Sequence, residues 1–315
     1  MSTATSSAGK GTHQPLPRRI ALRCAPLLAF PAEADLVRAA ALVAQADALL
    51  IAAGAGMGVD SGLPDFRGNG GFWKAYPTLA AERIALMDIA APAAFHSAPR
   101  RAWSYYGHQL GLYRRSLPHG GYGLLRKWGE AMRQGYFVFT SNVDGHFQRA
   151  GFSPLRIDER HGSLHRFQCL APCTPTLWPA TGLAPATDTA QCMLTGPVPA
   201  CPHCGGTARP NILLFDDDGW VGAPRAAQAM RCQGWLARAR RPLVIEIGAG
   251  LDNPTIRNFT RHVVRRHGGA LIRIDPFEPH VGELPGVGIA GGIRDTLAAI
   301  DTLLCARGQH VLTTQ

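Results

Sequence analysis

The sequence predicts an α/β protein: a doubly wound, parallel, Rossmann-like sheet with a small cysteine-bearing lobe and a helical insert. Four short apolar runs, at residues 47–53, 135–140, 241–247 and 270–274, each end in a polar or glycine turn. Helical stretches alternate with these runs, as in parallel sheets whose ligands bind beyond the carboxyl ends of the strands. Residues 161–209 instead are rich in Pro, Thr and Cys and show little hydrophobic periodicity. A segment this short needs a metal or disulfides to hold it together.

The composition is that of a globular chain. Its 315 residues are 46% hydrophobic and 17% charged, which is enough apolar material for a sizeable core. No apolar run approaches the 18 residues of a membrane-spanning helix, so we expect no membrane partner. Residues 1–30 are expected to form a flexible leader, because 1–17 are rich in Ser, Thr, Gly and Pro. Residues 20–34 resemble a signal peptide only weakly, since Arg23 and Pro26 interrupt them.

The chain carries a formal net charge of +10, almost entirely from arginine. Arginines cluster at 225–241 and 257–273, at the mixed spacings of solvated helix faces and without any nucleic-acid motif. We therefore expect no nucleic-acid partner. The charge suits anionic ligands and acidic protein partners instead. Nothing in the sequence specifies an oligomeric state.

The first element is an Ala-rich helix at 33–46, which leads into the apolar run at 47–53 and then into Gly54-Ala55-Gly56. Closely spaced glycines let the backbone turn sharply beside a ligand, and the N–H groups of such a turn can bind phosphate. The dinucleotide pattern G-x-G-x-x-G is not met, because Val59 stands at the third glycine position. Lys74 stands where a dehydrogenase keeps its ribose-binding acid, so a hydride-transferring dehydrogenase is disfavoured. An ordinary glycine-rich loop remains the alternative.

A helical region follows at 77–117. Its aromatic and leucine side chains recur near helical spacing, which is typical of core packing. These residues are Trp103, Tyr105, Tyr106, Leu110 and Tyr113.

Four of the eight cysteines have the spacing of a metal site. Cys169, Cys173, Cys201 and Cys204 stand as C-x3-C and C-x2-C, separated by 27 residues. Four thiolates fit tetrahedral Zn²⁺ with no open position, which indicates a structural site. Disulfides are the alternative, and Cys192 is a possible substitute ligand.

The remaining cysteines lie outside this segment. Cys24, Cys232 and Cys305 are expected to be small buried hydrophobes.

Four blocks occur in the order found in one enzyme family. Residues 54–68 read GAGMGVDSGLPDFRG and closely resemble the first signature of the sirtuins, NAD-dependent protein-lysine deacylases. Residues 140–145 (TSNVDG) are similar to the second signature, His161-Gly162-Ser163 to the catalytic histidine block, and the paired cysteines follow. The resemblance runs from about residue 48 to 300, and the chain is identified as a divergent member.

The resemblance implies NAD-dependent removal of acetyl-like groups from protein lysine, giving nicotinamide and O-acyl-ADP-ribose. His161 would be the general base that takes a proton from a ribose hydroxyl, because imidazole titrates near neutrality. His165 is the competitor, but it lacks the motif. Asn142 would position ribose or a water, and Asp144 would bind the nicotinamide carboxamide. Such an enzyme without a convincing export signal is expected to be cytoplasmic, which favours zinc over disulfides.

The NAD-binding residues implied by the resemblance lie in four segments. They are Gly54, Ala55, Gly56, Asp65, Phe66, Arg67, Ser141, Asn142, Asp144, Gly248, Ala249, Gly250 and Asp275.

Several polar supports of the family are replaced. Gly248-Ala249-Gly250 matches the family's G-T-S turn only at its glycine, Asp275 stands for Asn, and Ser141 for Gln. Residues 215–217 (FDD) stand for Phe-Gly-Glu. These departures leave open an ADP-ribosyltransferase, an NAD hydrolase, or a non-catalytic NAD or ADP-ribose sensor. Retention of His161 with Asn142 and Asp144 argues against the sensor.

The acyl pocket is expected to prefer neutral groups. Sirtuins that accept succinyl or malonyl lysine carry a W-x-F-Y-x-x-R helix, and residues 103–109 are similar, with Tyr106 at the tyrosine position. Gln109 replaces the arginine, and a neutral amide cannot form the bidentate ion pair with a carboxylate.

These assignments give the expected domains: an NAD-binding domain at 31–162 and 209–305, with a helical insert at about 75–130, and a zinc-binding lobe at 163–208.

Overall fold

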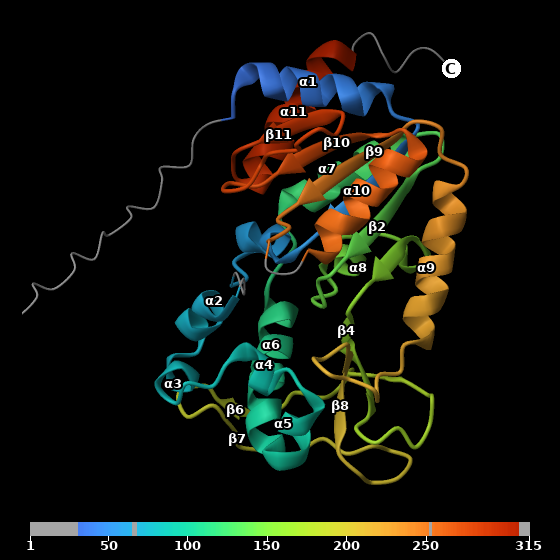
Figure 1. The fold of residues 1–315 in the computed structure, drawn as a ribbon. Helices are drawn as coiled ribbons and strands as arrows, with labels where there is room; N and C mark the ends of the chain where they lie inside the picture. The colour runs from blue at the N-terminus through green and yellow to red at the C-terminus, as the bar shows by residue number, and fades with distance from the viewer. Residues whose placement is uncertain (1–30, 65–67, 252–253, 309–315) are drawn as a thin grey trace, which may run out of the picture.

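A computed structural model describes residues 31–64, 68–251 and 254–308 (Figure 1). Its main sheet has six strands in the order β11-β10-β9-β1-β2-β3, and every pairing is parallel. The doubly wound fold is confirmed, and the four apolar runs form β1, β2, β9 and β10. The strands are β1 (Ala48–Ala53), β2 (Tyr136–Thr140), β3 (Ile157–Glu159), β9 (Pro242–Ile247), β10 (Ala270–Ile274) and β11 (Gly286–Ile289).

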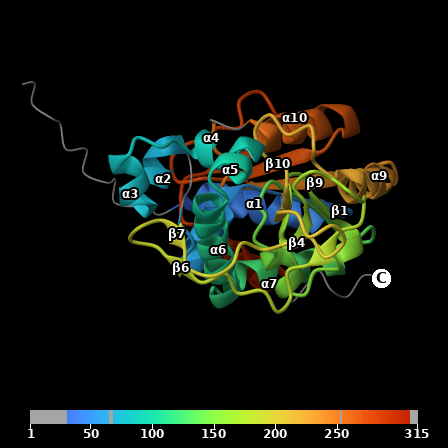
Figure 2. The ribbon, with the colours of Figure 1, turned by 90° about the horizontal axis from the view of Figure 1, so that it is seen from below.

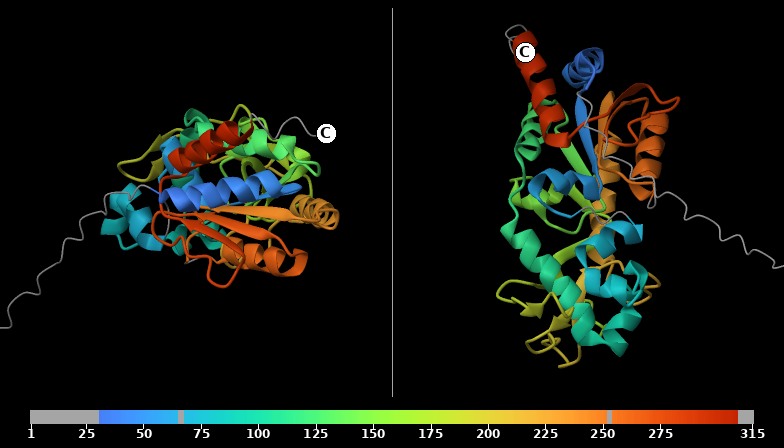
Figure 3. Two further views of the ribbon diagram at one scale, coloured as in Figure 1. Left: turned by 90° about the horizontal axis from the view of Figure 1, so that it is seen from above. Right: turned by 90° about the vertical axis from the view of Figure 1, so that its left-hand side faces the viewer.

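Helices cover both faces of the sheet (Figure 3). On one face lie α1 (Glu33–Gln45), α7 (Gly120–Ala131) and α11 (Ile293–Gly308). On the other lie α9 (Ala223–Leu236) and α10 (Thr255–His267). Strand side chains alternate between faces, so Leu49 and Ile51 enter the first core while Leu50 and Ala52 enter the second. A strand buried on both sides reads as one continuous apolar run, which is why β1 was predictable.

The segment between β1 and β2 holds most of the helical insert. It begins with the 3-10 helix η1 (Ala55–Ser61) and continues with α2 (Gly68–Ala75), α3 (Pro77–Ala81), α4 (Leu86–Ile89), α5 (Pro92–Ser97) and α6 (Pro99–Arg115). The predicted aromatic residues of α6 are buried, as expected. From below, α6 lies between α5 and the hairpin β6–β7 (Thr187–Asp188 and Met193–Leu194), which it contacts (Figure 2).

The cysteine-bearing lobe lies at the carboxyl edge of the main sheet (Figure 1). Its three-stranded sheet has the order β5-β4-β8, with β4 (Gly162–Cys169), β5 (Trp178–Pro179) and β8 (Ala208–Ile212). Lobe and insert share one core, in which Trp103 of α6 packs edge-on against Phe167 of β4. The segment from β2 to β3 holds α8 (His146–Arg149) and the short 3-10 helix η2 (Pro154–Arg156), which contacts β2 and α9.

Two strands of the main sheet escaped sequence analysis. β3 is three residues long and carries the carboxylates of Asp158 and Glu159, and β11 reads Gly-Val-Gly-Ile. Neither contains an apolar run. The domain boundaries stay predictions, and the expected leader lies outside the described residues. Within the part that the structure describes, no helix has the length and apolarity to cross a bilayer.

Candidate functional site

The candidate site begins where the loops after β1 and β9 meet. The strand order reverses at this pair, and ligands bind doubly wound sheets at such a point. Gly54 N donates to Ile247 O at 2.9 Å, and Gly56 N donates to Gly248 O at 3.1 Å. A Cβ at Gly54 would lie 2.6 Å from Gly248 O, and one at Gly248 would lie 2.5 Å from the backbone of Gly56. Gly248 also has φ +59°, so side chains here would force the two loops apart.

The loop after β2 is fastened to the same glycine turn. Asn142 Nδ2 donates to Gly54 O at 2.9 Å. The backbone N of Asn142 donates to Thr140 Oγ1 at 3.0 Å, and that hydroxyl donates to Ala53 O at 3.0 Å. The structure therefore brings the predicted Asn142 and Gly54 together.

His161 lies in the crossing from β3 to β4. Burial lowers the pKa of His161 below its usual 6.5, and a hydrogen bond to the backbone of Ser141 opposes this shift. A hydrogen bond that raises the pKa of a histidine is one that the ring donates, which leaves the other ring nitrogen as an acceptor. The following residue must be glycine, because Gly162 has φ +79° and its Cβ would lie 2.1 Å from Asn211 O. Burial thus favours the neutral form of the His161 imidazole, which lies beside the Asn142 loop.

Asp144 and His165 form a second, linked pair. Burial raises the pKa of Asp144, while the nearby His146 and His165 lower it. Asp144 Oδ1 accepts from His146 N at 2.8 Å, and His165 Nε2 lies 2.8 Å from Asp144 O. A carbonyl accepts only, so His165 donates through Nε2 and supports the Asp144 loop.

Asp144, Ser163 and His165 line a groove of about 990 Å³ that also contacts β5 and α9. His161 and Asn142 do not line this groove, so the groove contains His165 but not the predicted base.

The turn after β10 has a defined internal structure. Asp275 Oδ1 accepts from Phe277 N at 2.9 Å and from Glu278 N at 3.0 Å. Contact of Asp275 with a ribose stays a prediction, as do the ligand contacts of Ala55, Ala249 and Gly250. The predicted residues Asp65, Phe66 and Arg67 lie outside the described residues.

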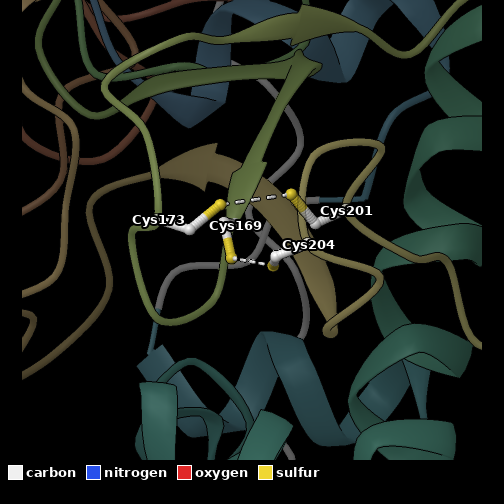
Figure 4. Close-up of side chains that lie close together, drawn as sticks. All are labelled: Cys169, Cys173, Cys201 and Cys204. Carbon is white, nitrogen blue, oxygen red and sulfur yellow. Dashed lines mark hydrogen bonds between the residues drawn. The ribbon is translucent and has the colours of Figure 1, made fainter.

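The predicted metal ligands come together (Figure 4). The sulfurs of Cys169, Cys173, Cys201 and Cys204 all lie within 4.8 Å of one another. The pairs Cys169–Cys204 and Cys173–Cys201 are each 3.6 Å apart. Zinc–sulfur bonds of about 2.3 Å place tetrahedral sulfurs about 3.8 Å apart, so the cluster fits Zn²⁺.

The knuckle of Cys201 stabilises its thiolate. Although burial raises the pKa of Cys201, hydrogen bonds from the backbone of Cys204 and His203 lower it to about 7. The chain turns here through Gly205, at φ +73°, whose N donates to Cys201 O at 2.9 Å.

The other cysteines correct two expectations. Cys192 is not part of the cluster, which four thiolates already complete; its thiol faces Thr189 O at 3.6 Å. Cys232 is buried as predicted. Cys305 is exposed on α11, because that helix turns its apolar side to α1 and α7, so the buried expectation was wrong. Cys24 lies outside the described residues.

The two predicted acyl-pocket residues are buried in α6. Tyr106 is stacked on Phe95 with ring centroids 5.5 Å apart. Gln109 hydrogen-bonds to Tyr105, and burial still raises the pKa of that phenol. That Tyr106 and Gln109 face an acyl channel stays a prediction.

Sequence analysis missed a buried ion pair beside α6. Arg209 and Asp217 have fully buried side chains, joined by hydrogen bonds of 2.8 and 2.7 Å. Asp216 has φ +52°, the conformation that the family's glycine would adopt without cost. An arginine before Pro210 and an acid at the family's glutamate position were the available signals.

Sequence analysis also missed Glu246, which is fully buried near the end of β9. Its carboxylate forms ion pairs with Arg273 and Arg257. A charged residue inside each of two apolar strands was the signal here.

Comparison with known proteins identifies the family of this chain. The model of the Sir2 family matches residues 54–232, more than half of the chain. The chain belongs to the Sir2 family. It is 26% identical over 231 residues to an NAD-dependent protein deacylase of Aquifex aeolicus, covering 73% of this chain and 84% of the relative. It is 27% identical over 257 residues to a deacylase of the same description from Thermococcus kodakarensis, covering 81% and 90%.

Solved structures show the same Sir2 fold. A Sir2 homologue mutant in complex with ADP-ribose superimposes with a TM-score of 0.68 at 22% identity, over 87% of this chain and 98% of the other. A Sir2 homologue in complex with NAD gives 0.63 at 23% identity, over 85% and 93%. The predicted family and its divergent character are confirmed.

Proposed function

We propose that this member of the Sir2 family is an NAD-dependent protein-lysine deacylase that yields nicotinamide and O-acyl-ADP-ribose. The observation that carries the proposal is the meeting of three loops at the carboxyl edge of the sheet. Gly54 contacts Gly248 and accepts from Asn142, and His161 binds the backbone of Ser141 next to it. The described residues fit NAD at this edge, since glycines let the loops after β1 and β9 meet at the switch point of the doubly wound sheet, where such sheets bind their ligands.

NAD supplies an electrophilic ribose carbon from which nicotinamide departs. His161 takes a proton from a ribose hydroxyl through the ring nitrogen that Ser141 does not hold. Asn142, fixed to Gly54 O, orients the ribose or a water, and Asp144 binds the carboxamide. By the resemblance, Phe66 would cover the ribose face that nicotinamide vacates, and Asp65 and Arg67 would contact the cofactor.

The zinc lobe would support this site rather than react. β4 runs directly from Gly162, beside the base, to the ligand Cys169, so the metal fixes the far end of that strand. Four thiolates leave zinc no open position for a substrate.

The partners would be acylated proteins carrying neutral acyl groups. Tyr106 and Gln109 would line the acyl channel, and Gln109 brings no positive charge to a buried succinyl carboxylate.

Product analysis tests the proposal. The purified chain is incubated with NAD and an acetyl-lysine peptide, and products are identified by mass spectrometry. O-acetyl-ADP-ribose supports the deacylase. Labelled protein would indicate the ADP-ribosyltransferase, peptide-independent ADP-ribose an NAD hydrolase, and binding without turnover a sensor.

A variant pair isolates the base. His161→Ala should lose about 10²–10⁴-fold in deacylation while it still binds NAD. His262→Ala, on the exposed face of α10, is the matched control and should keep full activity.

A further inference from the structure

Arg257 is placed to fix the glycine turn after β9. It lies in the first turns of α10, and its Nε donates to Ala249 O at 3.0 Å. Its Nη2 donates to Glu278 O, in the loop after β10, at 3.1 Å. One guanidinium thus joins the two loops that follow neighbouring strands.

Beneath this contact lies a carboxylate that anchors two arginines. Glu246 is fully buried, and Arg273 is its partner across β9 and β10 in the strand register. Arg273 Nε lies 2.5 Å from Glu246 Oε1, and Arg257 Nε lies 4.0 Å from the same oxygen. Arg273 also donates to His280 O, so both arginines hold the loop at 275–280.

We infer that Arg257 is a positioning residue for the NAD-binding turn, and this inference rests on the proposed function. The turn Gly248-Ala249-Gly250 has no hydroxyl, so its contacts with an anionic ligand must come from backbone N–H groups. In a planar trans peptide the C=O and the following N–H point in opposite directions. Arg257 draws the carbonyl of Ala249 toward α10, and the N–H of Gly250 therefore points away from that helix.

The buried Glu246 is otherwise costly, because a carboxylate removed from water needs paired charges and hydrogen bonds. Here that cost is offset by two guanidiniums that also bind three loop carbonyls.

Arg257→Lys is the decisive variant. Lysine keeps the charge, but its single ammonium group cannot present the planar fork that reaches Ala249 O and Glu278 O together. Arg261→Lys is the same substitution one turn later on the exposed face of α10 and serves as the control. Glu246→Gln is a second variant, which removes the anchor and leaves Arg257 in place.

NAD affinity is measured by titration calorimetry on the full chain, together with the urea midpoint of the unliganded protein and steady-state kinetics. We expect Arg257→Lys to weaken NAD binding about tenfold and to raise the KM for NAD similarly, with kcat nearly unchanged. Glu246→Gln should shift NAD affinity in the same direction, and Arg261→Lys should change neither quantity.

Two results separate the possible failures. If Arg257→Lys binds NAD as tightly as the wild type does, the positioning role alone is overturned, whether or not the urea midpoint changes. Wild-type protein that binds no NAD would overturn the proposed function and this inference with it.

Discussion

Asp217→Asn should strongly destabilise the protein, although it changes the shape of one side chain very little. Arg209 Nη1 and Nη2 lie 2.8 and 2.7 Å from the two carboxylate oxygens, and both side chains are fully buried. Asp217 Oδ2 also accepts from Leu214 N at 3.2 Å. An amide in place of the carboxylate sets an NH₂ group against a guanidinium and leaves its charge without compensation.

The contacts that remain are too few to offset this loss. Arg209 keeps one hydrogen bond to the remaining amide oxygen and one to Ile212 O at 3.3 Å, and its Nε has no partner among the described residues. Breaking one side of a buried pair typically costs about 3–5 kcal/mol. With a urea m-value of roughly 3 kcal/mol/M, the unfolding midpoint should fall by roughly 1 to 1.7 M.

Urea unfolding followed by circular dichroism measures this change. Asp218→Asn, at the exposed neighbouring position, is the matched control and should leave the midpoint within experimental error. A double variant, Arg209→Met with Asp217→Leu, should recover most of the lost stability, since apolar replacement of a whole buried pair is often neutral. An Asp217→Asn midpoint equal to that of the control would refute the reasoning.

Three further predictions follow from the site. Deacylation should fall on the acid side only below pH 6.5, because burial lowers the pKa of His161 and keeps the base neutral down to lower pH; a pH profile of kcat/KM with its acid limb above 7 would contradict this. Cys201→Ser or Cys204→Ser should release one zinc per chain and unfold the lobe, since structural zinc contributes on the order of 10 kcal/mol; metal analysis of reduced wild-type protein without zinc would sink the idea. Acetyl and butyryl peptides should be much better substrates than a succinyl peptide, and Gln109→Arg should recover some desuccinylation if this residue and Tyr106 face the acyl channel; a preference of the wild type for succinyl lysine would end that interpretation.

The sequence predicted those features that depend on one segment at a time. β10 occupies 270–274 as expected, and β1, β2 and β9 begin within a residue of the expected start, because strands buried on both faces are continuous apolar runs. The four cysteines were recognisable by spacing, since each closely spaced pair supplies two of the four metal ligands.

What could not be predicted depends on side chains that meet across the fold. Glu246 and Arg273 each look misplaced within an apolar strand, and only the register of β9 with β10 shows that they face each other. Cys305 was expected inside, but the orientation of α11 is set by α1 and α7 and leaves it exposed. His165 was the competitor of His161 as base, and only the fold shows that His165 Nε2 donates to Asp144 O.

The chain enters and leaves the zinc lobe at a single place. β4 and β8 run antiparallel, Gly162 is paired with Ile212, and Leu213 N donates to His161 O at 2.9 Å. Topologically the lobe is therefore a cassette, and a chimaera could exchange residues 163–211 for those of a relative without cutting any strand of the main sheet. Its core is nevertheless shared with α6, where Trp103 packs against Phe167, so a transplanted cassette must bring a matching apolar surface. The helix α6 and the zinc lobe are thus expected to change together when members of this family diverge or are recombined.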